Sequence, residues 1–151
     1  MRQKKENDKL LIYIDGASFG NPGHSGIGFV FCDENKNIIK KYYKYIGETT
    51  NNSAEYMSLI FALQKSIYFQ IKNIEVFSDS ELLVRQINKI YRVKHPQLLL
   101  LYQICIDLIN HFSSFKIHYI EREKNLTADK LAKKAAKLKG KTFEILEDDF
   151  N

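Results

Sequence analysis

Three short apolar segments follow one another near the start of the chain, and this arrangement restricts the possible folds more than any other feature. The segments cover residues 10–14, 26–32 and 38–46. Each is too short for a typical helix, and the residues between them, 16–26 with four glycines and then 33–37, are rich in turn formers. That order predicts three consecutive antiparallel strands joined by short connections.

The rest of the chain combines helical and strand patterns. The predicted elements are a helix over 53–67, a strand over 74–79, helices over 80–90 and 97–110, a strand over 115–120 and a helix over 126–139. The fourth and fifth strands, each reached through a helix, would lie parallel to the first strand. The sequence therefore predicts an α/β fold with one mixed sheet covered by helices.

Polar residues predict where three of the helices begin. Asn52 suits the N-cap of the first helix, Ser80 that of the second, and Asn125 or Thr127 that of the last. Gly140 is expected to stop the last helix. The acidic end of the chain, residues 147–151, is expected to fray.

The composition favours a single globular domain in the cytoplasm. A chain of 151 residues that is 44% hydrophobic can bury a continuous core. No segment approaches the roughly 20 apolar residues of a membrane helix, and no apolar signal-peptide core follows the basic start, so a membrane partner is not expected. Cys32 and Cys105 lie far apart in apolar runs, which predicts buried free thiols in a reducing compartment.

The charge balance favours a polyanionic partner. The formal net charge is +5 and the isoelectric point is about 9.1. Lysine outnumbers arginine, so attraction to phosphates is expected more than readout of bases. The lysine-rich segment 130–141 is expected to be a solvated helix face first and a phosphate-facing surface second.

Four carboxylates occupy positions where a ligand site is expected. Asp15 ends the first strand and Asp79 the fourth, while Glu55 and Asp129 lie near the starts of the first and last helices. Ligand sites in open α/β sheets form beyond the carboxyl ends of the parallel strands, where these side chains could converge. Crowded acids repel one another unless cations lie between them, and oxygen-only ligands suit Mg²⁺ or Mn²⁺.

Each acid also has a purely structural interpretation. Asp15-Gly16 is a common turn dipeptide, and Glu55 is placed where a capping-box glutamate would lie. Asp79 and Asp129 could complement helix dipoles. Taken singly, each structural interpretation is preferred, but the combination of all four acids favours a metal site.

The segments around these acids resemble the four motifs of type 1 ribonuclease H in the same order. They are residues 14–23 (IDGASFGNPG), 50–56 (TNNSAEY), 78–80 (SDS) and 122–132 (REKNLTADKLA). The resemblance extends from about residue 10 to residue 139. It implies a flexible segment over 1–9, a ribonuclease H catalytic domain over 10–140 and a C-terminal tail over 141–151.

The resemblance carries expectations about fold and activity. It implies a five-stranded mixed sheet in the order 3-2-1-4-5, flanked by helices, and hydrolysis of RNA paired to DNA with 5′-phosphate and 3′-hydroxyl products. It implies two Mg²⁺ ions with substrate bound, with Mn²⁺ as a substitute. By resemblance Asp15 bridges both ions, Glu55 and Asp79 hold the nucleophile side, and Asp129 completes the second site.

The same resemblance implies a set of residues that contact the hybrid. They are Gly16, Asn21, Thr50, Asn51, Asn52, Ser80, Arg122 and Asn125. Thr50 and Asn21 match positions that grip a DNA phosphate, and Asn51 and Asn52 match positions that reach into the minor groove. Loop solvation for Asn51 and helix capping for Asn52 are the structural alternatives.

Two departures from the family pattern stand out. Many members carry a mobile histidine before the last acid, where Tyr119 falls here, while His118 lies within the strand pattern and is interpreted as structural. Arg122 or Lys124 could supply part of the charge but not a proton shuttle near neutral pH. The short linker after Ile90 leaves no room for the inserted basic helix of some members.

Two other functions stay open on the sequence alone. A nuclease of the wider superfamily, also acting on double-stranded RNA or on DNA, would share the same chemistry. A non-catalytic nucleic-acid-binding module would be expected to lack one of the core acids, and none is lost. No protein partner is implied, and a monomer is expected.

Overall fold

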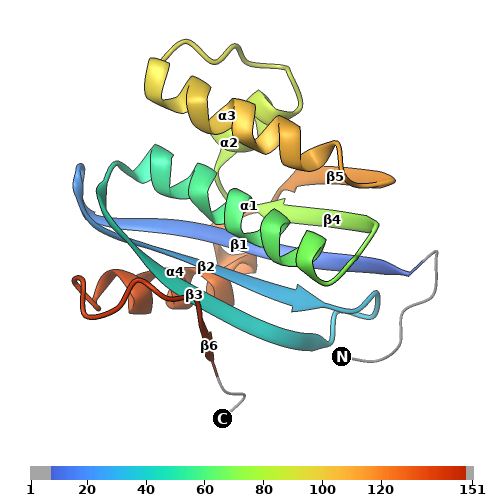
Figure 1. The fold of residues 1–151 in the computed structure, drawn as a ribbon, viewed down its shortest axis with the longest axis horizontal. Helices are drawn as coiled ribbons and strands as arrows, with labels where there is room; N and C mark the ends of the chain where they lie inside the picture. Colours follow the sequence, from blue (N-terminus) through green and yellow to red (C-terminus); the bar gives the residue numbers. More distant parts are fainter. Residues whose placement is uncertain (1–7, 149–151) are drawn as a thin grey trace.

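The computed structural model describes residues 8–148 and contains one mixed sheet flanked by helices (Figure 1). The strands are β1 (Lys9–Gly20), β2 (Gly23–Cys32), β3 (Ile38–Thr49), β4 (Asn73–Ser78), β5 (Ser114–Tyr119) and β6 (Leu146–Asp148). The helices are α1 (Asn51–Tyr68), α2 (Glu81–Ile87), α3 (Pro96–Ile109), the short 3₁₀ helix η1 (Arg122–Lys124) and α4 (Leu126–Ala136). Lys9, placed by the sequence in the N-terminal segment, is the first residue of β1, and residues 1–7 lie outside the described part.

The strand order is β5-β4-β1-β2-β3-β6. For the first five strands this is the predicted order, with β1 antiparallel to β2 and parallel to β4. The predicted number of five strands is wrong, because β6 pairs antiparallel with β3. The expected fraying is also wrong for Glu147 and Asp148, while residues 149–151 lie outside the described range.

Ion pairs explain why this acidic segment adds a strand. The Lys40 ammonium lies 3.2 Å from Glu147 Oε1, and the Lys134 ammonium lies 2.6 Å from Asp148 Oδ1. Lys41 lies 3.4 Å from Asp148 Oδ2. The lysines of the β3 edge and of α4 therefore offset the acidic charge that led us to expect a frayed end.

The long loop predicted over residues 16–26 is mostly strand. β1 continues to Gly20 and β2 begins at Gly23, with Ser18 opposite Ser25. The glycines of this segment allow close packing between elements more than they form turns. A Cβ on Gly26 would lie 2.4 Å from the Ala132 carbonyl oxygen of α4, so α4 can pack against the sheet only because that side chain is absent.

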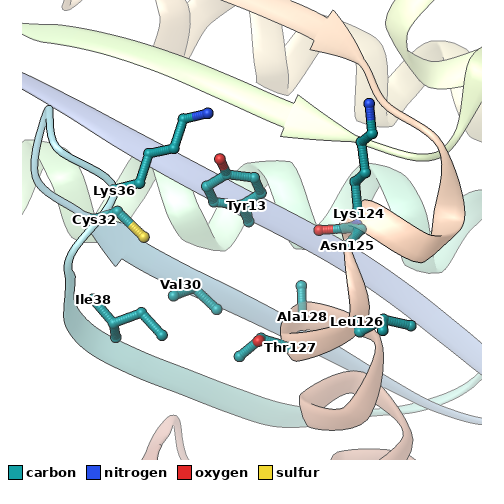
Figure 2. A pocket seen from close by; sticks show the side chains of 10 residues that line it. All are labelled: Tyr13, Val30, Cys32, Lys36, Ile38, Lys124, Asn125, Leu126, Thr127 and Ala128. Atoms are coloured by element: carbon teal, nitrogen blue, oxygen red, sulfur yellow. The ribbon is translucent and has the colours of Figure 1, made fainter.

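The helices form two unequal layers. α1, α2 and α3 cover one face of the sheet and α4 covers the other (Figure 1). The larger core, under the three helices, holds Phe29, Tyr42 and Leu59 among its fully buried side chains. The smaller core packs Val30 against Leu131 of α4, and a cavity opens beside it at the start of that helix (Figure 2).

Neither cysteine is paired, and no described helix is both long and apolar enough to cross a bilayer. Cys32 and Cys105 are buried, as the apolar runs around them predicted. Burial raises the pKa of the Cys105 thiol to about 12. Both thiols are therefore packing groups in this fold.

The caps of the helices correct one prediction. The Thr50 hydroxyl accepts a hydrogen bond from the Ser53 N–H at 3.2 Å, so Thr50 caps α1. Asn52 is an exposed residue inside the helix, and its predicted capping role is wrong. Ser80 caps α2 as predicted, accepting from the Leu83 N–H at 3.2 Å. Asn125 precedes α4 without a capping side-chain bond.

The revised cap gives a stability prediction. Thr50→Ala is expected to lower the free energy of unfolding by about 1 kcal/mol, because it leaves an N–H group of the first turn without its partner. Asn52→Ala should change it by less than about 0.5 kcal/mol, since the residue is exposed and caps nothing. Urea unfolding of both variants measures the difference. A larger loss for Asn52→Ala would return the cap to that residue.

Candidate active site

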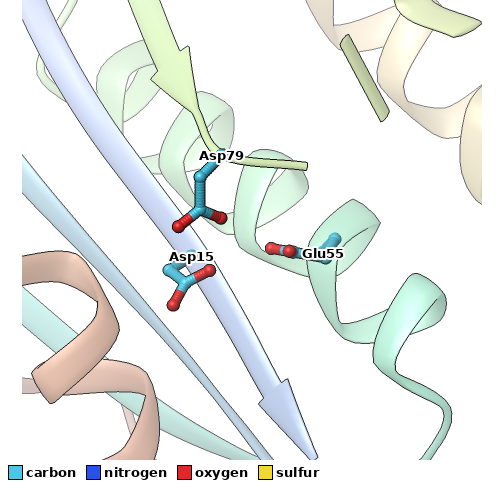
Figure 3. A group of neighbouring side chains, drawn as sticks. All are labelled: Asp15, Glu55 and Asp79. Atoms are coloured by element: carbon cyan, nitrogen blue, oxygen red, sulfur yellow. The ribbon is translucent and has the colours of Figure 1, made fainter. Parts of the chain in front are cut away.

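Three carboxylates meet where β1, β4 and α1 come together. Oxygen atoms of Asp15, Glu55 and Asp79 all lie within 4.8 Å of one another (Figure 3). The strand register explains two of the three positions. Ile14 of β1 is paired with Ser78 of parallel β4, so the next residue of each strand emerges at the same edge of the sheet.

Glu55 reaches the cluster because α1 crosses β1 at a glycine. A Cβ on Gly16 would lie 2.3 Å from the Ala54 carbonyl carbon, so only glycine permits this close approach. The Gly16 N–H donates to Glu55 Oε1 at 2.8 Å. This bond holds the Glu55 carboxylate beside Asp15. Gly16 therefore determines both the close contact between α1 and β1 and the position of Glu55.

Burial and mutual repulsion make these groups resist ionisation. Burial, followed by the charges of Glu55 and Asp79, raises the pKa of Asp15 far above its usual value. Burial and the charge of Asp79 raise the pKa of Glu55, opposed by the Gly16 N–H and the Arg122 charge. Burial also raises the pKa of Asp79. The positive charges of the protein itself therefore do not balance three ionised carboxylates in this cluster.

Asp129, the fourth predicted acid, lies beside Asp15 but outside the group of three. Its carboxyl contributes by hydrogen bonding and charge to the raised pKa of Asp15. The Lys133 ammonium, one turn further along α4, lies 3.0 Å from Asp129 Oδ2. The structure thus brings three of the acids together and places the fourth next to them, paired with a lysine.

Four of the predicted substrate residues gather at one end of this site. Asn21 lies at the tip of the β1–β2 hairpin, and its Oδ1 accepts from the Asn51 N–H at 3.0 Å. Thr50 caps α1, and Asn51 and Asn52 form the exposed first turn. The hairpin tip and the helix start are therefore joined into one polar surface.

The remaining predicted residues line the acids more closely. Gly16 bonds Glu55, and the Ser80 N–H donates to the buried Ser78 hydroxyl at 3.0 Å. Arg122 is exposed, and its charge lowers the pKa of both Glu55 and Asp79. Asn125 is buried, and its Nδ2 donates to the Ile14 carbonyl at 2.8 Å.

Two contributors escaped the sequence reasoning. The tie between Asn125 and Ile14 spans 111 positions, so no local pattern could indicate it. Lys133 could have been found, because a lysine four residues after Asp129 on a helix is a common ion-pair spacing. The two histidines nearest the motifs bond elsewhere, His118 to Glu75 Oε1 at 2.8 Å and His24 to the Tyr45 hydroxyl at 2.7 Å.

A family model described as reverse transcriptase-like matches residues 13–135. Among solved structures, RNase H1 from Halobacterium salinarum NRC-1 superposes with a TM-score of 0.83 at 33% identity, covering 85% of this chain and 98% of that one. LC11-RNase H1, solved in complex with an RNA/DNA hybrid, gives 0.77 at 40% identity, covering 85% and 96%. The chain belongs to the type 1 ribonuclease H family.

Curated relatives of this ribonuclease H chain include longer proteins. It is 36% identical over 128 residues to a bifunctional protein of Mycobacterium tuberculosis, covering 84% of this chain but only 35% of that protein. The chain therefore spans about a third of the length of the first curated relatives. As the sequence predicted, the α2–α3 connection, residues 88–95, holds no inserted helix among these described residues.

Proposed function

We propose that this ribonuclease H-family chain is a metal-dependent endonuclease that hydrolyses the RNA strand of RNA–DNA hybrids. The observation that carries the proposal is the cluster of Asp15, Glu55 and Asp79, whose oxygens lie within 4.8 Å of one another and which come from three of the four family motifs. The relative that is 40% identical and bound to an RNA/DNA hybrid supports the choice of substrate. The products would carry 5′-phosphate and 3′-hydroxyl ends.

The donor set fits Mg²⁺, with Mn²⁺ as a substitute. All of the donors are carboxylate oxygens, without the histidine or cysteine that zinc prefers. Asp79 Oδ2 is buried and has no hydrogen-bond partner, and the raised pKa values of Asp15 and Glu55 indicate missing positive charge. A divalent cation would bind Asp79 Oδ2 and also supply the missing positive charge.

Asp15, Glu55, Asp79 and Asp129 would hold two such ions once substrate is bound. The ions supply a lowered pKa for the attacking water and offset the charge on the leaving 3′-oxygen. The chain's own part is positional. The Gly16 N–H holds Glu55 in place, the adjacent strand ends place Asp15 beside Asp79, and Lys133 restrains Asp129.

The polar surface beside the acids would hold the hybrid. Thr50, Asn21, Asn51 and Asn52 lie at the hairpin tip and the start of α1, where they would contact the DNA strand and the minor groove. Gly16 and Ser80 would contact the RNA strand, and Arg122 and Asn125 complete the residues proposed to contact the hybrid. Recognition through 2′-hydroxyls and groove shape predicts little dependence on base sequence.

Removal of metal tests the chemistry. With excess EDTA, cleavage of a hybrid should stop, and added Mg²⁺ should restore it because the carboxylates then regain their compensating charge. The released fragments should accept ligation at the 5′ end without prior phosphorylation. Cleavage that continues in EDTA, or fragments ending in 2′,3′-cyclic phosphate, would exclude this mechanism.

The placement of the histidines gives a further prediction. His24 bonds Tyr45 and His118 bonds Glu75, and neither bonds an acid of the cluster, so no proton shuttle is expected from them. The pH–rate profile in Mg²⁺ should lack a limb near the ordinary histidine value of about 6.5 and should rise toward alkaline pH as the attacking water loses its proton.

Alanine variants are the controls for that profile. Replacement of His24, His95, His111 or His118 should leave the rate of hybrid cleavage within about threefold, because none contributes to the acid cluster. Loss of cleavage in a folded His118→Ala variant would reveal a shuttle that the structure does not place at the site.

A further inference from the structure

Lys133 lies beside one acid of the proposed metal site. Its ammonium is 3.0 Å from Asp129 Oδ2, one turn earlier along α4. Within residues 8–148, none of the acids Asp15, Glu55 and Asp79 forms an ion pair of this kind. The four acids are therefore unequal, because one of them already holds a cation that belongs to the protein.

Asp129 has neighbours of opposite charge. Its carboxyl contributes by hydrogen bonding and charge to the raised pKa of Asp15, while Lys133 pairs with it from the next turn of the helix. The side chain of Asp129 is only 13% exposed, whereas that of Lys133 is 49% exposed. The ammonium can therefore move into solvent on its flexible stem while Asp129 and α4 stay in place.

An ammonium on a carboxylate makes that carboxylate a weaker ligand for a metal ion. A divalent cation at Asp129 must displace the Lys133 ammonium or bind close to its like charge, and both cost free energy. Asp15, Glu55 and Asp79 instead repel one another, so a cation among them relieves repulsion. Without substrate, the first cation should therefore bind at these three acids.

We propose that Lys133 is a positioning residue that competes with a divalent cation for Asp129. The inference rests on the proposed metal-dependent function. Lys133 holds the Asp129 carboxylate in place in the free protein, and the ion pair opens when a second cation binds there. The free protein therefore binds its second ion more weakly than its first, and the charge of Lys133 sets the difference.

A Mg²⁺ titration of the ¹³C-labelled full chain, without nucleic acid, tests the proposal. The side-chain carboxyl resonances of Glu55 and Asp129 report the two positions separately. In the wild type, the Glu55 resonance should reach its midpoint at a lower Mg²⁺ concentration than the Asp129 resonance does. Lys133→Gln removes the charge and keeps a polar side chain, so the Asp129 midpoint should fall by about threefold or more.

Two further variants make the result specific. Lys130→Gln removes the same charge from an exposed residue next to Asp129 that forms no ion pair within residues 8–148, so the Asp129 midpoint should stay at the wild-type value. Lys133→Arg keeps the cation and should also keep that midpoint. Unchanged amide resonances of the α1 core in each variant show that the fold survives.

Three results would overturn the proposal. They are equal Asp129 midpoints in the wild type and Lys133→Gln, an equal fall in Lys130→Gln, and an equal fall in Lys133→Arg. In each of these cases Mg²⁺ still shifts the Glu55 resonance, so the proposed metal site stands and only the competition is wrong. Absence of any Mg²⁺-dependent shift at all four acids would contradict the proposed function and this inference with it.

Discussion

Asp79→Asn should lower the rate of Mg²⁺-dependent hybrid cleavage by more than about 100-fold, because it removes the charge of a proposed metal ligand while keeping the shape of the side chain. The Oδ2 atom of Asp79 is buried without a hydrogen-bond partner, so a cation is the group that would use it. Single-turnover cleavage of a labelled hybrid measures the loss. Near-normal cleavage by the folded variant would remove Asp79 from the site.

The same variant should not lose stability in the absence of metal. The folded state raises the pKa of Asp79, so the folded protein binds this proton more tightly than the unfolded chain does. Ionisation of Asp79 therefore destabilises the fold at pH values above the unfolded pKa of about 3.9. In EDTA at pH 7 the variant should melt at or above the wild-type temperature, and the difference should vanish near pH 3.

A nearby exposed acid provides the control. Glu81 begins α2 two residues after Asp79 and pairs with Arg85 at 3.1 Å on the surface. Glu81→Gln should keep the cleavage rate within about twofold, since exposed pairs of this kind contribute little. A large loss of cleavage rate in Glu81→Gln would show that charge near the site, and not metal coordination by Asp79, accounts for the loss of rate in Asp79→Asn.

Gly16→Ala is expected to damage both the fold and the reaction. The new Cβ would lie 2.3 Å from the Ala54 carbonyl carbon, so α1 must move away from β1 and the bond from the Gly16 N–H to Glu55 must lengthen. Overpacking of this kind costs about 1–3 kcal/mol, and a displacement of about 1 Å at an active site can cost about 100-fold in rate. Urea unfolding and single-turnover cleavage measure the two losses.

Gly47→Ala separates the two effects. Gly47 has a φ of +87°, so alanine is strained there, but its Cβ would meet nothing within 4 Å. This variant should lose about 1 kcal/mol of stability and keep its cleavage rate. If Gly47→Ala loses cleavage as severely as Gly16→Ala does, loss of stability alone explains the result, and the helix crossing does not position Glu55.

The sequence predicted most of the fold because its elements carry local signals. Short apolar segments predicted the first five strands, the family resemblance implied their order, and Ser80 marked the start of α2. The glycines of 16–26 misled the prediction, because glycine indicates a turn and a close helix contact equally well. β6 was missed since its three residues depend on ion pairs with lysines far away in sequence.

The acids of the candidate site were named from the sequence, but their environment could not be predicted from it. Strand ends and family motifs marked Asp15 and Asp79, and parallel pairing of the preceding residues places them side by side. Which group caps α1 depends on the backbone geometry at Thr50. The bond from Asn125 to Ile14 and the contact of Asp129 with Asp15 depend on how α4 packs against β1, which no local pattern encodes.

Strand selectivity tests the central claim most directly. A hybrid labelled separately on its RNA and DNA strands, together with duplex RNA and duplex DNA of the same sequence, is incubated with the protein in Mg²⁺. Recognition through 2′-hydroxyls beside the cluster of Asp15, Glu55 and Asp79 predicts fragments from the RNA strand of the hybrid, with the DNA strand intact and both homoduplexes cut far more slowly. Cleavage of the DNA strand, or equal cleavage of duplex RNA, would contradict the account.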